Sequence, residues 1–110
     1  MLAVRVLEYL DGRGRSPYST WFTDLDASAA AKIATAVYRL AAGNFSNVKG
    51  AGEGVLERTI DFGPGYRIYF GRDGEYAVIL LGGSSKRRQG GAIAAAQERW
   101  ADYKKRKERE

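Results

Sequence analysis

Short turn signals divide the second half of this chain into three apolar segments, and their spacing constrains the fold more than any other feature. The segments are residues 55–62, 66–72 and 76–81, and they end at Gly63-Pro64-Gly65, Asp73-Gly74 and Gly82-Gly83. An Asp-Gly pair between apolar segments is a strong hairpin signal, and glycine allows the positive φ angles of tight turns. Because no linker is long enough for a helix, the pattern predicts three consecutive strands in an antiparallel meander.

The first half of the chain carries signals for one strand and two helices. The predicted elements are a strand over residues 3–9, a helix from Ser16-Pro17 through Leu25 and a helix over residues 27–42. Asp11-Gly12 is a turn pair that ends the strand, and a serine followed by proline is typical of a helix start. Asp26 precedes the second helix and predicts an N-cap.

The remaining segments complete the predicted order β-α-α-β-β-β-α. Residues 43–54 contain four glycines and predict a mobile loop, and a last helix is expected to begin between Ser84 and Gly91. Since no helix separates the last three strands, helices must pack on the faces of the sheet. We therefore expect one α+β domain over residues 1–110, with an antiparallel sheet packed by helices.

Residue types missing from the sequence exclude several kinds of chemistry. The 110 residues contain no cysteine and no histidine, and the formal net charge is +5. Disulfides, thiol nucleophiles and histidine bases are thereby excluded, so an enzyme built from this chain must use Arg, Lys, Tyr, Asp or Glu. We expect no metal and no small-molecule cofactor. The positive charge favours polyanionic partners such as nucleic acid or an acidic protein.

The hydropathy pattern predicts a cytoplasmic protein that does not interact with membranes. No segment approaches the 18 or so apolar residues of a membrane span, and the first ten residues carry Arg5 and Glu8 within their apolar run. That run lacks the uninterrupted apolar core of a signal peptide.

Two arginines stand out in the predicted meander. Strand alternation places Arg67 on one face together with Tyr69, and Arg58 in a row with Leu56 and Ile60. An arginine in an apolar row requires a carboxylate partner or an anionic ligand. For each arginine taken alone, a salt bridge within the sheet or a surface position is the simpler interpretation.

A basic triplet, Lys86-Arg87-Arg88, follows the last predicted strand and precedes the last helix. Backbone N–H groups at a helix start, adjacent serines and three cations together suit a phosphate group. A solvated loop that only improves solubility is the alternative. The glycines before the triplet lack the Lys-Ser signature of a P-loop.

If these basic residues meet in one groove, they suit RNA cleavage by its own 2′-hydroxyl. Arginine stays cationic and matches phosphate oxygens in pairs, so it can neutralise the charge that a phosphorane gains. Lys86 or Tyr69 is a candidate proton donor, and Glu57 or Asp61 is a candidate proton acceptor. We therefore expect the Arg58, Arg67 and Lys86–Arg88 groups to converge on one groove.

Three parts of the sequence resemble a known family. These are residues 52–70 with the motif Gly-Pro-Gly-Tyr-Arg-Ile-Tyr-Phe, the segment Val78–Gly83, and the segment Trp100–Lys104. They resemble the phage-related addiction module killer branch of the RelE/ParE toxin superfamily, close to HigB-type toxins, over nearly the whole chain. The resemblance implies a ribosome-dependent messenger-RNA endoribonuclease, the toxin of a type II toxin-antitoxin system, held inactive by a helix-turn-helix antitoxin.

The resemblance also implies site residues. The catalytic positions of the family fall on Arg58, Arg67, Lys86 and Arg87, and we expect RNA contacts from Tyr69, Arg88, Lys104 and Lys105. The cationic tail from Lys104 to Arg109 also suits an acidic antitoxin segment, and a solvated helix end is the alternative.

The chain departs from its well-studied relatives at two places. A second strand lysine is Ile60 here, and the tyrosine expected early in the last helix is replaced by Gly90-Gly91-Ala92-Ile93. The same fold also carries ParE-type poisons of DNA gyrase, which lack the nuclease residues. Retention of the four basic positions favours cleavage over a gyrase poison, and a non-toxic nucleic-acid-binding domain is a third alternative.

Overall fold

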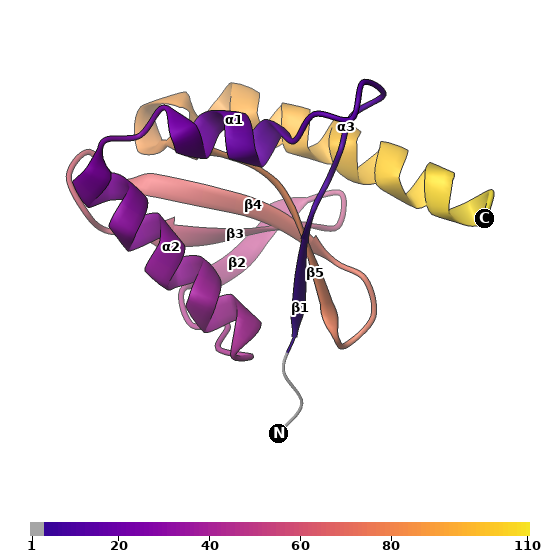
Figure 1. Cartoon of the computed structure of the whole chain (residues 1–110), viewed down its shortest axis with the longest axis horizontal. Coiled ribbons are helices and arrows are strands. Elements are labelled where there is room, and N and C mark those ends of the chain that lie inside the picture. Colours follow the sequence, from indigo (N-terminus) through magenta and orange to yellow (C-terminus); the bar gives the residue numbers. More distant parts are fainter. Residues whose placement is uncertain (1–3) are drawn as a thin grey trace.

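A five-stranded sheet lies between helices in the computed structural model, which describes residues 4–110 (Figure 1). In chain order the elements are β1 (Arg5–Glu8), α1 (Pro17–Thr23), α2 (Ala27–Ala41), β2 (Val48–Gly52), β3 (Val55–Ile60), β4 (Tyr66–Arg72), β5 (Ala77–Ser85), the 3-10 turn η1 (Lys86–Arg88) and α3 (Gln89–Glu108). The α+β class is confirmed. Ala3, the predicted start of the first strand, lies outside the described residues.

The sheet combines antiparallel and parallel neighbours, in the order β1-β5-β4-β3-β2. The predicted meander of β3, β4 and β5 is confirmed, because each strand pairs antiparallel with the next. Strand β1, however, runs parallel to β5, with Arg5 opposite Ala77. The expectation of a wholly antiparallel sheet is therefore wrong. A parallel neighbour needs a long connection, and the chain between β1 and β5 supplies it.

Strand β2 corrects the prediction of a loop over residues 43–54. Val48 lies opposite Arg58 and Gly50 opposite Leu56, in antiparallel pairing with β3. The segment was not predicted as a strand because its glycines lack strand propensity and its exposed edge shows no alternation. Hydrogen bonds to β3 determine its conformation instead. The turn into β3 uses positive φ angles at Gly52, Glu53 and Gly54.

Strand β5 is longer than predicted, because it continues through Gly82-Gly83 to Ser85. The two glycines are therefore not a turn. The pairing register shifts at this point, between Tyr69 and Phe70 of the neighbouring strand. A Cβ atom at Gly83 would lie 2.3 Å from ring atoms of Trp21, so the missing side chain lets the α1 indole pack directly on the strand.

Each face of the sheet has its own apolar core. Side chains of α1 and α2 pack with Ile68, Phe70 and Leu80 on one face, and α3 packs Ala96 and Trp100 against the other. Because both faces are covered, β5 is apolar at successive positions and does not alternate. Within residues 4–110, no helix has the length and apolarity that crossing a membrane requires.

Both predicted helix caps are confirmed. The Ser16 hydroxyl accepts a hydrogen bond from the Ser19 amide at 3.0 Å, and the Asp26 carboxylate accepts one from the Ala29 amide at 2.8 Å. Each cap satisfies an amide that the first helical turn leaves without an intrahelical partner. The two caps fix where α1 and α2, the helices that cover one face of the sheet, begin.

Tyrosine ionisation predicts a loss of stability in alkaline solution. Burial raises the pKa of Tyr9, Tyr18 and Tyr103 from 10.0 to about 12. Since the folded state holds these protons more tightly than the unfolded state does, their stabilisation is complete below pH 10 and is lost as the pH rises to about 12. Thermal melts across this range are expected to show a falling Tm.

The Tyr18→Phe variant tests the cause, because burial is the main reason for the raised pKa of this phenol. Its Tm is expected to fall less steeply with pH than that of the unchanged protein. Tyr76 is 51% exposed, so Tyr76→Phe is the matched control and should keep the original slope. Equal slopes for both variants would contradict the prediction.

Candidate functional site

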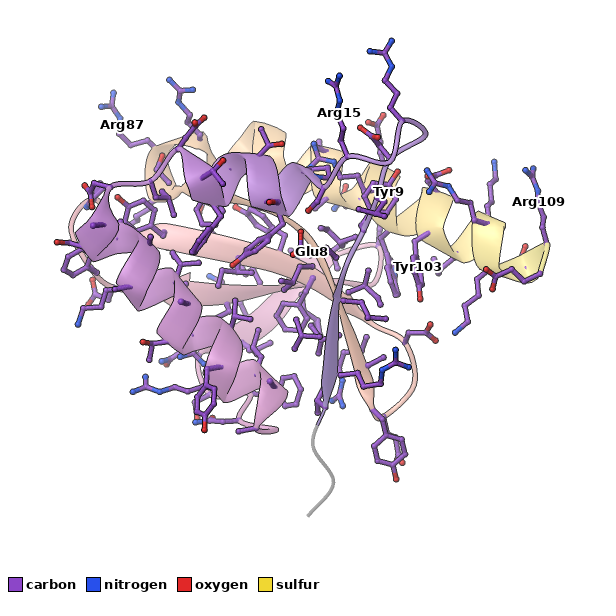
Figure 2. The ribbon with its side chains drawn as sticks, viewed as in Figure 1. Glu8, Tyr9, Arg15, Arg87, Tyr103 and Arg109 are labelled. Carbon is purple, nitrogen blue, oxygen red and sulfur yellow. The ribbon has the colours of Figure 1, made fainter. Side chains whose placement is uncertain are left out.

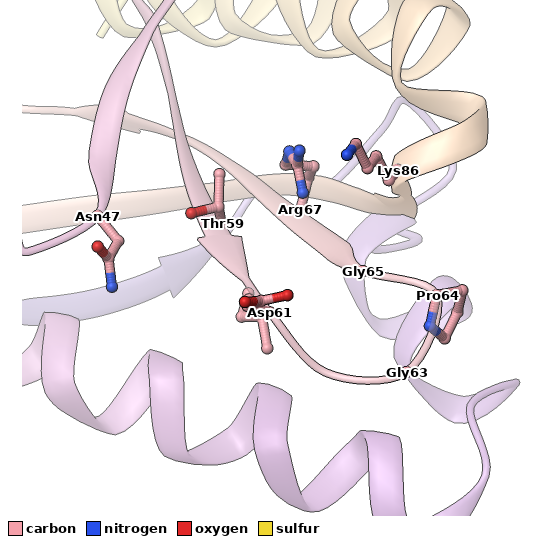
Figure 3. Close-up of a pocket in the computed structure, with 9 residues that line it drawn as sticks. Asn47, Thr59, Asp61, Gly63, Pro64, Gly65, Arg67 and Lys86 are labelled. Atoms are coloured by element: carbon pink, nitrogen blue, oxygen red, sulfur yellow. The ribbon is translucent and has the colours of Figure 1, made fainter.

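The ends of β3, β4 and β5 surround a groove of about 590 Å³. Its lining residues are Asn47, Thr59, Ile60, Asp61, Gly63, Pro64, Gly65, Arg67 and Lys86 (Figure 3). We call it the Arg67 groove. The loop that follows β3 returns the chain to Tyr66, which pairs with Ser85 at the end of β5. This pairing brings the first residue of the basic triplet to the groove.

Gly65 brings Arg67 and Lys86 together. The Lys86 amide donates a hydrogen bond to the Gly65 carbonyl at 3.0 Å, and Gly65 has a positive φ of 85°. A Cβ atom at Gly65 would lie 3.4 Å from Lys86 Cβ and 4.0 Å from Arg67 Nη1. In Figure 3 the two cationic side chains lie on the same side of the start of β4. Two positive charges therefore face one small volume, together with the carboxylate of Asp61, and such a pair of cations suits an anion.

Glu57 holds the guanidinium of Arg67 from within the sheet. Glu57 Oε2 and Arg67 Nε lie 3.1 Å apart, and the side chains are only 6% and 12% exposed. Neither atom has a well-aligned hydrogen bond, so the contact is an ion pair at close range. Arg67 Nη1 also donates to the Tyr66 carbonyl at 3.2 Å. Glu57 is thus a positioning residue for Arg67, and Asp61, which is exposed and lines the groove, is the better placed proton acceptor.

Arg58 does not join this groove, which corrects the expected convergence of the three basic groups. It lies opposite Ile68, on the face that α2 covers, whereas Arg67 and Glu57 face α3. The side chain is 4% exposed, and Nη1 donates to the Ser46 carbonyl at 2.7 Å. Strand alternation gives the physical reason, because positions 58 and 67 point to opposite faces in this register.

Tyr69 is completely buried, which rules out its predicted contact with RNA. Its hydroxyl lies 3.0 Å from the hydroxyl of Ser84, beneath α3. Burial raises the pKa of the Tyr69 phenol, with the charge of Glu57 adding to the rise. A phenol that is neither accessible nor acidic cannot serve as the proton donor. Lys86 is therefore the remaining candidate of the two.

Arg87, predicted as a catalytic residue, and the remaining predicted RNA contacts are exposed but lie outside the groove. Arg87 and Arg88 belong to η1, directly after Lys86, and neither lines the groove; Figure 2 shows Arg87 pointing away from the fold. Lys104 and Lys105 are exposed near the other end of α3, where Lys104 Nζ lies 5.8 Å from the Trp100 ring centroid. A helix of 20 residues is about 30 Å long, so these lysines are far from Lys86.

Sequence reasoning missed two polar residues of the groove, Asn47 and Thr59. Asn47 precedes β2, the strand that was predicted as loop, and its carbonyl accepts a hydrogen bond from the Thr59 amide at 3.1 Å. No sequence signal indicates that contact. Among residues 4–110, no group of three or more acidic side chains is arranged to hold a metal ion.

Comparison with known proteins finds a relative that matches part of this chain. No protein-family model matches the chain. A protein of Haemophilus influenzae, described as "Uncharacterized protein", is 38% identical over 65 residues, which cover 58% of this chain. The same match covers 66% of that protein, so the chain spans just under two thirds of its length. The similarity gives this chain a relative without giving it a function.

Proposed function

We propose that this chain is the toxin of a type II toxin-antitoxin system and that it cleaves messenger RNA at the Arg67 groove. The observation that carries the proposal is the position of Arg67 and Lys86 side by side at one open groove. The motif over residues 63–70, which resembles that of RelE/ParE toxins, supports the same conclusion because it contains both the turn that shapes the groove and Arg67.

The groove residues suit attack by the RNA 2′-hydroxyl on the adjacent phosphorus. Asp61 accepts the proton of the attacking hydroxyl, and the guanidinium of Arg67 neutralises the additional charge on the phosphorane. The ammonium of Lys86 donates a proton to the departing 5′-oxygen. Glu57 keeps the Arg67 guanidinium in place throughout. This division of roles uses only residues that line the groove or contact one that does.

The partners follow from the same proposal. The messenger RNA is cut on the ribosome, in the cytoplasm, and a helix-turn-helix antitoxin keeps the toxin inactive. The exposed cations Arg87, Arg88, Lys104 and Lys105 contact RNA phosphates away from the cleaved bond. Such contacts strengthen binding in a manner that depends on salt and not on sequence.

A second candidate function is a ParE-type poison of DNA gyrase. The position of Arg58 on the opposite face of the sheet favours it, because only two of the expected cationic groups then remain at the groove. The two candidates differ in what overproduction does to a cell. Cleavage predicts messenger RNA cut within translated regions, whereas a gyrase poison predicts intact transcripts, broken DNA and an SOS response.

The decisive experiment is overproduction followed by mapping of transcript ends and of DNA breaks in the same culture. Transcripts cut only while they are being translated would support the proposal. Broken DNA with intact transcripts would support the second candidate, and harmless overproduction would contradict both. An adjacent gene for a helix-turn-helix protein that co-purifies with this chain would support the toxin-antitoxin assignment.

Asp61→Asn tests the proton acceptor. We expect cleavage to fall about 10²-fold, because an amide cannot accept the hydroxyl proton. The free energy of unfolding should change by no more than about 0.5 kcal/mol, since Asp61 is exposed. Glu75→Gln, which removes an exposed carboxylate from the β4–β5 turn, is the matched control and should cleave normally. Equal cleavage rates for the two variants, measured with purified ribosomes and messenger RNA, would contradict the assignment of Asp61.

A further inference from the structure

Arg58 is a buried cation whose hydrogen-bonding capacity is incompletely used. Its side chain is 4% exposed, and one donor, Nη1, is bound to the Ser46 carbonyl at 2.7 Å. The Nε atom is also buried and has no hydrogen-bond partner among the described residues. Buried polar groups are nearly always hydrogen-bonded, so an orphaned donor on a charged group needs a specific explanation.

No carboxylate of residues 4–110 forms an ion pair with Arg58. The ion pairs of the described chain are those of Arg67 with Glu57, Arg106 with Asp102 and Lys107 with Asp73. The contrast with Arg67 is direct, because both arginines lie in the central strands but only Arg67 has an acid beside it. A buried charge is normally paired. Arg58 thus lacks the close partner that Arg67 has, which is the environment expected of a site for an anion from outside the chain.

The pocket beside Arg58 has the charge and the donors for such an anion. Its volume is about 210 Å³, and it is lined by Lys32, Thr35, Ala36 and Arg39 of α2 and by Asn47, Arg58, Thr59, Ile60 and Asp61. Three cationic residues, Lys32, Arg39 and Arg58, line it together with one carboxylate, that of Asp61. Burial and the nearby charge of Arg39 both lower the pKa of Arg58, as expected where cations gather without an anion.

We propose that this pocket, which we call the α2 pocket, binds a phosphate group at a site separate from the Arg67 groove. Two positive charges in excess match the one to two negative charges of a phosphate at neutral pH. Guanidinium groups match phosphate oxygens in pairs, and the side-chain amide of Asn47, which also lines the pocket, can donate to a remaining oxygen. The volume lies below the range of pockets that enclose whole small molecules, so one anionic group fits and a complete nucleotide does not.

The phosphate has two chemical sources that the location permits. Both pockets are lined by Asn47, Thr59, Ile60 and Asp61, so they adjoin at the end of β3. A strand of nucleic acid bound at the Arg67 groove can therefore place a second backbone phosphate beside Arg58. A free phosphate ion or the phosphate of a small metabolite can occupy the pocket in the same way. The site does not depend on cleavage, so it stands even if the proposed function fails.

The test is calorimetric titration of the purified protein with inorganic phosphate at constant ionic strength, with chloride as the reference anion. We expect saturable phosphate binding that the Lys32→Gln/Arg39→Gln double variant weakens at least tenfold. Both side chains are exposed, so this variant should fold normally. The matched control, Arg13→Gln/Arg109→Gln, removes the same charge from exposed positions that line neither pocket and should bind phosphate as the unchanged protein does.

Two further variants locate the bound ion. Lys86→Gln removes a cation of the Arg67 groove alone, so phosphate bound at that groove no longer contributes in this background. The remaining binding should keep its affinity and should still be weakened at least tenfold by Lys32→Gln/Arg39→Gln. Arg58→Met removes the buried cation while keeping an apolar chain of similar length, and should abolish phosphate binding. If Arg58→Met does not fold, the two glutamine double variants and Lys86→Gln still decide the question. Binding that survives Lys32→Gln/Arg39→Gln in the Lys86→Gln background, or that disappears in Lys86→Gln alone, would overturn the proposal.

A single-stranded oligonucleotide distinguishes the two sources. Competition between the oligonucleotide and inorganic phosphate, lost in the Lys32→Gln/Arg39→Gln variant, would support a backbone phosphate. Phosphate binding that the oligonucleotide leaves unchanged would support a free phosphate or a phosphorylated small molecule. If an acidic peptide binds the α2 pocket and inorganic phosphate does not, the pocket recognises protein carboxylates and the phosphate assignment is wrong.

Discussion

Replacing Arg67 with alanine is expected to slow messenger-RNA cleavage by about 10²- to 10³-fold, as the loss of one donor to a charged transition state does in other enzymes. Arg67 lines the groove beside Lys86 and, among residues 4–110, is the only guanidinium that does so. The rate should be measured with ribosomes, messenger RNA and purified protein. Growth after overproduction gives a second, independent measurement.

The single variant also has a structural cost that must be separated from the catalytic one. Removing Arg67 leaves Glu57 buried without its partner, and breaking a buried ion pair in this way costs about 3 kcal/mol. The Glu57→Gln/Arg67→Ala double variant removes both charges and should recover much of that stability in urea unfolding. It should not recover cleavage. A folded double variant that cleaves as fast as the unchanged protein would show that Arg67 has no catalytic role.

Alanine at either of two strand glycines is expected to lower the free energy of unfolding by about 3 kcal/mol, at the upper end of the usual cost of overpacking. A Cβ atom at Gly83 would lie 2.3 Å from the Trp21 ring, and one at Gly71 would lie 2.4 Å from the Trp100 ring. Each indole is held against the sheet by the helix that carries it, Trp21 by α1 and Trp100 by α3. Urea unfolding followed by tryptophan fluorescence measures both variants.

Gly50→Ala is the matched control, because Gly50 is also a strand glycine but has no atom within 4 Å of a Cβ built there. Its effect should stay within about 1 kcal/mol. A Trp21→Leu background should reduce the cost of Gly83→Ala, because the two changes act on one contact. Costs for Gly71→Ala and Gly83→Ala no larger than that of Gly50→Ala would contradict the packing described for both faces.

The local sequence signals predicted the fold well where one residue pair decides the conformation. Strand β4 has the predicted bounds of 66–72, because Asp73-Gly74 and the preceding Gly-Pro-Gly turn leave no other length. Strand β2 and the end of β5 were not predicted. In both places glycines were interpreted as a loop or a turn. The glycines of β2 instead pair with β3, and Gly83 lies beneath Trp21. Those outcomes depend on contacts between distant segments, which no local pattern contains.

The candidate site was predicted in part for the same reason. Alternation already placed Arg58 among apolar residues, and the register of β3 against β4 then determines that it faces away from Arg67. Tyr69 was expected to be accessible because the sequence does not show which face of the sheet α3 covers. Trp100 and Ala96 cover the face of Tyr69, so the phenol is buried. The pairing of Arg67 with Glu57 likewise required the register.

The parallel pairing of β1 with β5 has a consequence for biosynthesis. Val6 is synthesised early but pairs with Val78, so β1 has no neighbouring strand until most of the chain has been translated. At about 5–20 residues per second, that delay lasts several seconds. Each nascent chain therefore carries β1, with its backbone N–H and C=O groups unpaired, without its neighbour during synthesis. The yield of native protein in a cell should depend on whether a chaperone shields that strand until Val78 emerges.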